Sequence, residues 1–374
     1  MKKTMKKALA LATTMTMIGF SLSACGGSSS SGSTTAAAGA AQTTSGAAET
    51  AAAAESQKTD AAAGDATTFV AAHGSTEEST LGQFFIASQK YLEENTTDLR
   101  MEIYPAAQLG NDSELAESIV EGSIQMTSGA ASNYINVVPD LAVFDLPFAF
   151  NSYQEMRDVY SDPDLYAAVD KVFQTKGLKL GCLRGEGFRT LFTKGHPVAA
   201  PEDIKGLKLR VMDNQYHIKL WGDLGADTTT VAFSELYTAL QQGVVEAQEN
   251  TVTSTLTNFN LYEVTDSATM VKHEVTLHPF MINLDWYNSL TEQQQKELID
   301  ACQYAQKNEA DRGAEDEENL KKLESDHNYK VFEFTDDQIE QCRQATNDVR
   351  EQLKSNTNAE LYDAYVSTIE KYQK

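Results

Sequence analysis

Residues 233–250 read FSELYTALQQGVVEAQEN and predict a helix, a stop and a strand in succession. The helix covers Leu236–Gly243 and ends at a glycine, the residue best suited to the left-handed conformation that follows a helix C-terminus. Val244–Glu249 then continues as a strand. The same order occurs 121 positions earlier, where Leu115–Gly122 is followed by Ser123–Ser128. A pattern repeated in this way is typical of an α/β protein with two lobes.

Strands and helices also alternate around the first copy of this pattern. Thr67–His73 reads as a short buried strand, and the apolar residues within Leu81–Leu92 fall largely on one helix face. Leu99–Tyr104 alternates as a second strand. Asn111–Glu114 matches a helix N-cap, and Ile124–Met126 returns as a strand. The alternation predicts an α/β domain with a largely parallel sheet.

Candidate site positions follow from where these strands end. Ligands of open α/β sheets bind beyond the carboxyl ends of the strands. That rule singles out His73, Ser128–Asn133 and Glu249–Asn250.

The C-terminal part is mainly helical. Thr291–Gln294 is a capping-box pattern that opens a charged helical stretch continuing to about Asp326, long enough for a helix that spans two lobes. Val331–Phe334 reads as a strand, and Thr335–Gln338 starts further helices.

The N-terminus predicts export. Lysines at positions 2, 3, 6 and 7 precede Ala8–Leu22, an apolar stretch too short for a good transmembrane span. Leu22-Ser23-Ala24-Cys25 resembles the bacterial lipobox, which implies cleavage before Cys25 and lipidation of its sulfur. An ordinary secretory signal with an incidental cysteine is the alternative. Residues 26–65 are almost all Ser, Gly, Ala and Thr, and such a tether has a reach of about 35 Å.

Composition and missing motifs exclude several classes of function. The net charge of −24 disfavours nucleic acid and anionic membrane surfaces as partners. Cys182, Cys302 and Cys342 have no spacing typical of a metal site or a disulfide framework, and we expect buried thiols. No nucleophile elbow or phosphate loop occurs, and Gly185–Thr190 lacks the third glycine of a dinucleotide fingerprint. His273–His278 has the wrong spacing for a zinc helix and reads as strand. We therefore predict no cofactor, no metal and no catalytic residue.

Several motifs occur in the order found in one transporter family. Gly206–Val211 (GLKLRV), Leu224–Ala226 and residues 233–250 resemble the solute-binding subunits of tripartite ATP-independent periplasmic (TRAP) transporters. Further matches are Tyr104-Pro105, Gln108–Gly110, Val143–Phe148 (VFDLPF) and Gly187–Arg189. Together they cover nearly all of residues 67–374.

The resemblance implies a two-lobed, periplasmic-binding-protein-like α/β fold with a cleft between the lobes, crossing strands and a long helix spanning both. We expect lobe I at 66–186 plus 275–314 and lobe II at 187–274 plus 315–374, after a signal peptide at 1–24 and a tether at 25–65. The family binds small organic acids, closes on them and docks on an ion-coupled permease. It catalyses nothing.

The resemblance also assigns site residues. Arg210 matches the arginine that grips the ligand carboxylate, for which a planar guanidinium is well suited, whereas Lys208 is assigned to solvent. Further predicted site residues are Arg189 as a second arginine, Asn250 as a hydrogen-bond partner of the same carboxylate, Phe233 as an apolar wall, His73 as a polar contact, and Asn133, Glu186, Asp213 and His278 as cleft lining. Core packing is the alternative for Phe233, and a structural role is the alternative for His73.

The predicted function is a monomeric receptor, lipid-anchored at the outer face of the cytoplasmic membrane or in a periplasm, that delivers an organic acid to a TRAP permease. Hexuronates and C4-dicarboxylates are the leading ligand classes, with hexuronates preferred because the far wall looks polar and uncharged. A binding lipoprotein for an ATP-driven importer of amino acids or peptides is the alternative. A secreted hydrolase is a third hypothesis, for which the sequence offers no nucleophile.

Overall fold

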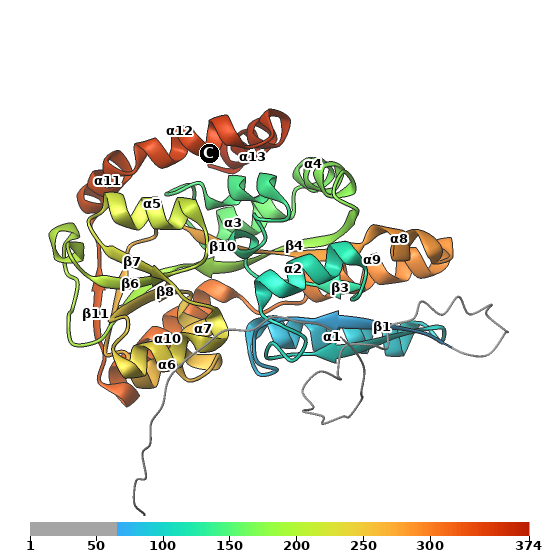
Figure 1. Cartoon of the computed structure of the whole chain (residues 1–374), viewed down its shortest axis with the longest axis horizontal. Coiled ribbons are helices and arrows are strands. Elements are labelled where there is room, and N and C mark those ends of the chain that lie inside the picture. The colour runs from blue at the N-terminus through green and yellow to red at the C-terminus, as the bar shows by residue number, and fades with distance from the viewer. Residues whose placement is uncertain (1–65, 374) are drawn as a thin grey trace, which may run out of the picture. The chain divides into compact units, whose positions relative to one another are not determined.

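The computed structural model describes residues 66–373, which contain two β-sheets with helices packed around them (Figure 1). The predicted signal peptide, Cys25 and the tether lie outside the described residues. The two sheets are the centres of two lobes, and this confirms the predicted α/β fold class.

The first sheet has the order β2-β1-β3-β10-β4. Its strands are β2 (Leu99–Tyr104), β1 (Thr67–Ala72), β3 (Met126–Thr127), β10 (Val275–Asn283) and β4 (Leu178–Phe188). Helices α1 (Thr80–Asn95) and α9 (Glu292–Lys307) pack on it. A buried aromatic cluster of Phe69, Phe84, Phe85 and Phe280 forms part of the core between them.

The second sheet has the order β11-β9-β5-β8-β6-β7. Its strands are β11 (Lys330–Glu333), β9 (Ser267–Met270), β5 (Thr190–Thr193), β8 (Ala247–Asn250), β6 (Lys208–Val211) and β7 (Asp227–Thr230). Helix α6 (Leu236–Gln242) precedes β8, as the sequence predicts.

The two predicted glycine stops are confirmed. Helix α2 (Asp112–Glu121) ends at Gly122, whose φ is 82°, and α6 ends at Gly243, whose φ is 72°. Both glycines are in the left-handed region that other residues adopt only with strain. The strand after Gly122 is shorter than expected, because β3 pairs with its neighbours only at Met126 and Thr127.

Both sheets are largely parallel, as predicted, and each contains one antiparallel strand, β10 in the first and β5 in the second. Strands β1, β2 and β3 are parallel to one another, but β10 is antiparallel to β3 and to β4. In the second sheet β5 is antiparallel to both β8 and β9. Each antiparallel strand comes directly after a crossing of the chain, which passes between the sheets from Phe188 to Thr190 and returns from Met270 to Val275. Strands β5 and β10 therefore run against the other strands of their sheets, whereas β4 and β9, which precede the crossings, do not.

The predicted continuous helix after Thr291 is interrupted. The structure has α9, a break at residues 308–311, and α10 (Arg312–His327). Asn308 donates from Nδ2 to the Tyr304 carbonyl at 2.7 Å, and the Asp311 side chain accepts from the Gly313 amide at 3.0 Å. Asn and Asp compete for backbone hydrogen bonds in this way, so they end one helix and begin the next within the charged stretch.

The remaining elements cover the sheets and the crossings between them. The α-helices are α3 (Tyr153–Tyr160), α4 (Pro163–Gln174), α5 (Gln215–Asp223), α7 (Val252–Thr257), α8 (Leu284–Ser289), α11 (Asp336–Ala345), α12 (Asn347–Asn356) and α13 (Ala359–Tyr372). Short 3-10 helices are η1 (Ala131–Asn133), η2 (Pro139–Asp145), η3 (Pro201–Ile204), η4 (Phe233–Glu235) and η5 (Leu261–Val264).

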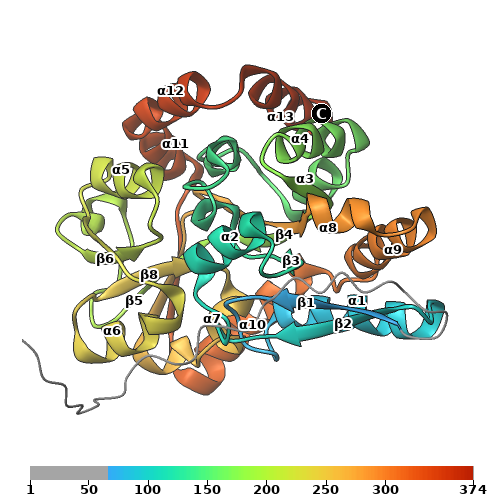
Figure 2. The ribbon, with the colours of Figure 1, turned by 45° about the vertical axis from the view of Figure 1, so that its right-hand side comes forward.

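Helix α13 lies against α3 and α4 (Figure 2). The prediction places α13 in lobe II and the other two in lobe I, so this helix connects parts assigned to different lobes. Cys182, Cys302 and Cys342 are buried free thiols, as expected. Within residues 66–373, the helices are all too short or too polar to cross a membrane.

Candidate functional site

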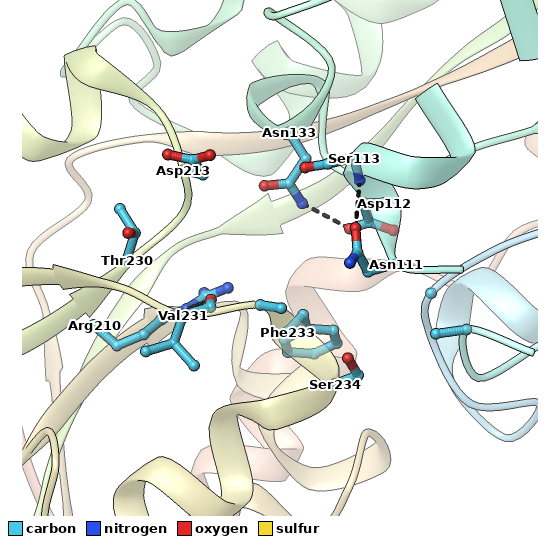
Figure 3. A pocket seen from close by; sticks show the side chains of 13 residues that line it. Asn111, Asp112, Ser113, Asn133, Arg210, Asp213, Thr230, Val231, Phe233 and Ser234 are labelled. Atoms are coloured by element: carbon cyan, nitrogen blue, oxygen red, sulfur yellow. Dashed lines mark hydrogen bonds between the residues drawn. The ribbon is translucent and has the colours of Figure 1, made fainter. Parts of the chain in front are cut away.

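A cavity of about 250 Å³ has lining residues from both halves of the fold (Figure 3). One side comes from β6 and the segment between β7 and η4, and it includes Arg210, Thr230 and Phe233. The other side comes from the loops after β1 and β2, the start of α2, and η1. An adjoining cavity of about 40 Å³ shares Asp112, Asn133, Arg210 and Phe233 with the first. The loops after β1 and β3 meet here, as the strand-end rule predicts.

Arg210 is the cation of this cavity. It lies on β6 between buried Leu209 and Val211, and its side chain turns into the cavity, where the residue is only 2% exposed. Its Nε donates to the Val231 carbonyl at 2.8 Å. Its two Nη groups donate to no residue among 66–373. Burial lowers the pKa of Arg210 to about 10, partly opposed by Glu249, so it stays charged at neutral pH. Lys208 on the same strand is exposed, as predicted.

Asp112 is a lining residue that the sequence prediction missed. It is the first residue of α2, and its Oδ2 accepts from Asn133 Nδ2 at 2.7 Å. A side chain on Gly74 would come within 2.5 Å of Asp112 Oδ1, so the backbone of the loop after β1 lies directly against this carboxylate. Burial raises the pKa of Asp112, while Asn133 and Arg210 oppose that shift.

The sequence contained a signal for Asp112. Asn111 forms the predicted capping box with Glu114, since its Oδ1 accepts from the Glu114 amide at 3.2 Å. The sequence pattern assigned Asp112 only to this helix cap and not to the site. The strand-end rule applies equally to the loop after β2, and it would have included this residue.

Arg189 lines the smaller cavity, but its donors already have partners. Its Nε and Nη2 donate to the carboxylate of buried Glu249, and its Nη1 donates to Thr276 Oγ1 at 2.9 Å. Burial acts to raise the pKa of Glu249, but Arg189 and His273 outweigh it and hold that pKa well below its usual range. The guanidinium and the carboxylate thus form a buried ion pair beside the cavity.

Glu186 and His278 form a second buried pair in the wall of the smaller cavity. Glu186 Oε1 accepts from Thr80 Oγ1 at 2.8 Å, and Glu186 Oε2 lies 3.1 Å from His278 Nε2. Arg184 Nη1 lies 2.8 Å from His278 Nδ1. Burial lowers the pKa of His278 to about 4, so the neutral ring accepts from Arg184 and donates to Glu186.

The other predicted residues divide into lining and non-lining positions. Asn250 lines the smaller cavity, and its Oδ1 accepts from the Thr251 amide at 2.9 Å. Phe233 lines both cavities and packs edge-on against Phe259, with ring centroids 5.5 Å apart. Asp213 is exposed and lines the larger cavity, which Asn133 also does.

His73 does not line either cavity. It is fully buried and stacks on Phe85 with ring centroids 4.7 Å apart, and burial lowers its pKa to about 4. Its neighbours Gly74 and Ser75 provide the lining instead.

One cluster within residues 66–373 has the composition of a metal site, and none of its three residues lines either cavity. Asp145, His217 and Glu274 are buried with their ligand atoms within 4.8 Å of one another. His217 Nε2 is 3.0 Å from Glu274 Oε2 and 3.5 Å from Asp145 Oδ1. Burial opposes the charge on His217, but Glu274 and Asp145 raise its pKa to about 10. A proton on His217 therefore gives the two carboxylates a shared buried cation.

Comparisons with known proteins identify relatives of this chain in sequence and in structure. A solute-binding protein of Verminephrobacter eiseniae is 31% identical over 208 residues, which are 56% of this chain and 62% of that relative. The match thus spans less than two thirds of that relative's length. The sugar acid binding protein of Advenella mimigardefordensis, solved with galactonate, has a TM-score of 0.77 and 25% identity over 83% of this chain and 99% of its own.

A second solved structure, a TRAP periplasmic solute-binding protein from Polaromonas sp. JS666 bound to D-erythronate, has a TM-score of 0.74 and 26% identity over 80% of this chain and 98% of its own. The model of a family described as bacterial extracellular solute-binding protein, family 7, matches residues 71–356. This chain therefore belongs to the family 7 bacterial extracellular solute-binding proteins, which confirms its resemblance to the solute-binding subunits of TRAP transporters.

Proposed function

We propose that this protein is an extracytoplasmic receptor that captures a small organic acid in the cavity between its two halves. The observation that carries the proposal is the buried Arg210, whose two Nη groups face the cavity without an acceptor among residues 66–373. A protein with a net charge of −24 repels carboxylates at long range, so binding needs a local cation in a water-poor site. The relatives solved with galactonate and D-erythronate bind acids of this kind.

The proposed roles of the other lining residues follow from their contacts. Asn250 can donate from its amide to the same carboxylate, because within the described part of the chain its side chain is engaged only at Oδ1, by Thr251. Phe233 provides an apolar surface beside Arg210. Arg189 is held by its ion pair with Glu249, and we assign it to the structure of the cavity wall and not to direct binding of the ligand carboxylate. His73 has a structural role, because it stacks on Phe85 and so supports the loop that contributes Gly74.

Delivery to a membrane partner completes the proposal. The receptor closes on its ligand and docks as a monomer on an ion-coupled TRAP permease. Lipidation at Cys25 and the tether to residue 65 would keep it near that permease, at the outer face of the cytoplasmic membrane or in a periplasm. A receptor for an ATP-driven importer remains the alternative for the partner, and the proposal includes no catalytic step.

A ligand screen tests the central claim. Purified protein is mixed with organic acids, amino acids, peptides and neutral sugars, and its melting temperature is measured. A ligand that binds only the native state raises that temperature with its concentration. We expect stabilisation by one class of organic acid. Stabilisation by amino acids or peptides alone would support the importer alternative, and no response to any acid would overturn the proposal.

A further inference from the structure

Two opposite charges face the larger cavity from different halves of the fold. Arg210 points in from β6, and Asp112 reaches in from the start of α2 (Figure 3). Both residues also line the smaller cavity, so a ligand that occupies either one lies close to both charges. Each charge influences the other, since Asp112 acts to raise the pKa of Arg210 and Arg210 acts to lower the pKa of Asp112.

Asp112 has acceptor capacity that the protein leaves unused. A carboxylate offers about four lone-pair sites on its two oxygens. Asn133 occupies one on Oδ2, and the Gly74 backbone lies against Oδ1. The remaining sites accept hydrogen bonds and donate none while the group is ionised. They match a ligand hydroxyl, and they do not match a second ligand carboxylate.

The charged side chains that line the two cavities also favour a ligand with a single carboxylate. Arg189 is paired with Glu249, which leaves Arg210 as the one cation without a protein counter-ion among the described lining residues of the two cavities. Asp112 and Asp213 line the larger cavity as carboxylates with no cationic partner within 4 Å among residues 66–373. A ligand with one carboxylate can therefore pair with Arg210. The second carboxylate of a dianion would have no unpaired cation in the described lining to pair with.

Neutral polar side chains also line the two cavities, beside apolar residues such as Phe233. Side-chain hydroxyls and amides that line the two cavities come from Ser75, Asn111, Ser113, Asn133, Thr230, Ser234, Asn250, Ser254 and Thr276. Hydroxyl and amide groups both donate and accept, as the hydroxyls of a sugar acid do. This corrects the expectation of an uncharged far wall, because Asp112 adds a negative charge to that wall.

We propose that Asp112 restricts this receptor to polyhydroxy monocarboxylates, with the ligand carboxylate on Arg210 and a ligand hydroxyl donating to Asp112, and that it excludes dicarboxylates of similar size. The inference rests on the function proposed above and narrows its ligand class. Two like charges held a few ångströms apart in a partly buried site repel one another strongly, whereas a hydroxyl in the same place gains a charge-assisted hydrogen bond.

Calorimetric titration of the purified protein tests this exclusion. A panel of sugar acids, including D-galactonate, and a panel of C4-dicarboxylates, including succinate, are titrated at neutral pH, and the strongest binder of each panel is compared. We expect the wild type to prefer the sugar acid. Asp112→Asn keeps the shape but removes the charge, so the ratio of the two Kd values should shift toward the dicarboxylate by about tenfold or more.

Glu117→Gln is the matched control. Glu117 is exposed on the same helix and lines neither cavity, so its loss removes one charge from α2 without touching the site. Its Kd ratio should equal that of the wild type. If Asp112→Asn does not fold, Asp112→Ser provides the same removal of charge with a smaller side chain.

The outcomes separate this inference from the proposed function. A wild type that binds acids but prefers dicarboxylates, or an Asp112→Asn variant with an unchanged ratio, overturns the role of Asp112 and leaves the organic-acid receptor intact. A protein that binds no acid of either panel overturns both. Loss of binding to both panels in Arg210→Ala, with the shifted ratio in Asp112→Asn, supports both.

Discussion

Arg210→Ala is the most direct test of the carboxylate anchor. The substitution removes two Nη groups that face the cavity, while the lost Nε hydrogen bond to Val231 is internal to the protein. Hydrogen bonds to charged groups contribute about 1.5–3 kcal/mol each, so two of them amount to about 3–6 kcal/mol. Part of this is offset by the water contacts that the ligand carboxylate loses on binding. We therefore expect Kd to rise at least about 100-fold, or about 2.7 kcal/mol.

Isothermal titration calorimetry with the best ligand from the screen measures this change. Lys208→Ala is the matched control, because Lys208 lies on the same strand with its side chain 56% exposed and pairs only with Glu246, at 3.2 Å. That variant should bind like the wild type, since an exposed ion pair contributes about 0–1 kcal/mol to stability and does not touch the ligand. Unfolding curves for both variants verify that the fold is retained. Near-wild-type affinity in Arg210→Ala would refute the anchor.

Three further predictions concern the buried charges around the site. Glu249→Gln leaves Arg189 buried without its anion, and chemical denaturation should show a free energy of unfolding lower by about 3–5 kcal/mol, whereas Glu246→Gln at an exposed pair should cost at most about 1 kcal/mol. The folded pKa of His217 is raised above 6.5 to about 10, so its stabilisation is complete below pH 6.5 and is lost as the pH rises toward 10. His217→Gln should abolish that decline in denaturation curves measured across this range, and an unchanged decline would contradict the buried cation. The folded pKa of His278 is depressed from 6.5 to about 4, so protonation favours the unfolded state and stability falls as the pH drops through this interval; His278→Gln should flatten that slope.

Local sequence signals predicted the elements whose ends are set by nearby residues. Gly122 and Gly243 end their helices because a left-handed residue is needed at those points, and glycine adopts that conformation most easily. The break at residues 308–311 was missed for a related reason. The charged composition is the same on both sides of it, and the local hydrogen bonds of Asn308 and Asp311 mark where one helix ends and the next begins.

The site was predicted less completely because its residues acquire their roles through partners distant in sequence. The segment around Arg210 identified the residue, and the structure places it facing a cavity. For Arg189 the sequence could not show that Glu249, 60 positions later, takes up its donors. The approach of Gly74 and Asn133 to Asp112 likewise depends on how the loops after three strands come together.

The crossing of the chain between the two sheets sets the order in which this protein can mature. The first sheet lacks its β10 strand until residues 275–283 have been made, and the second lacks β11 until residues 330–333 have followed. Helix α13, at the very end of the described chain, then closes over α3 and α4. Neither half can therefore fold to completion while the C-terminal third is still on the ribosome or inside a translocation pore. Long-range pairing of this kind favours slow, late folding, during which unpaired strand edges are exposed. A product that ends before residue 275 would lack strands of both sheets, so we expect a quality-control protease to cleave it.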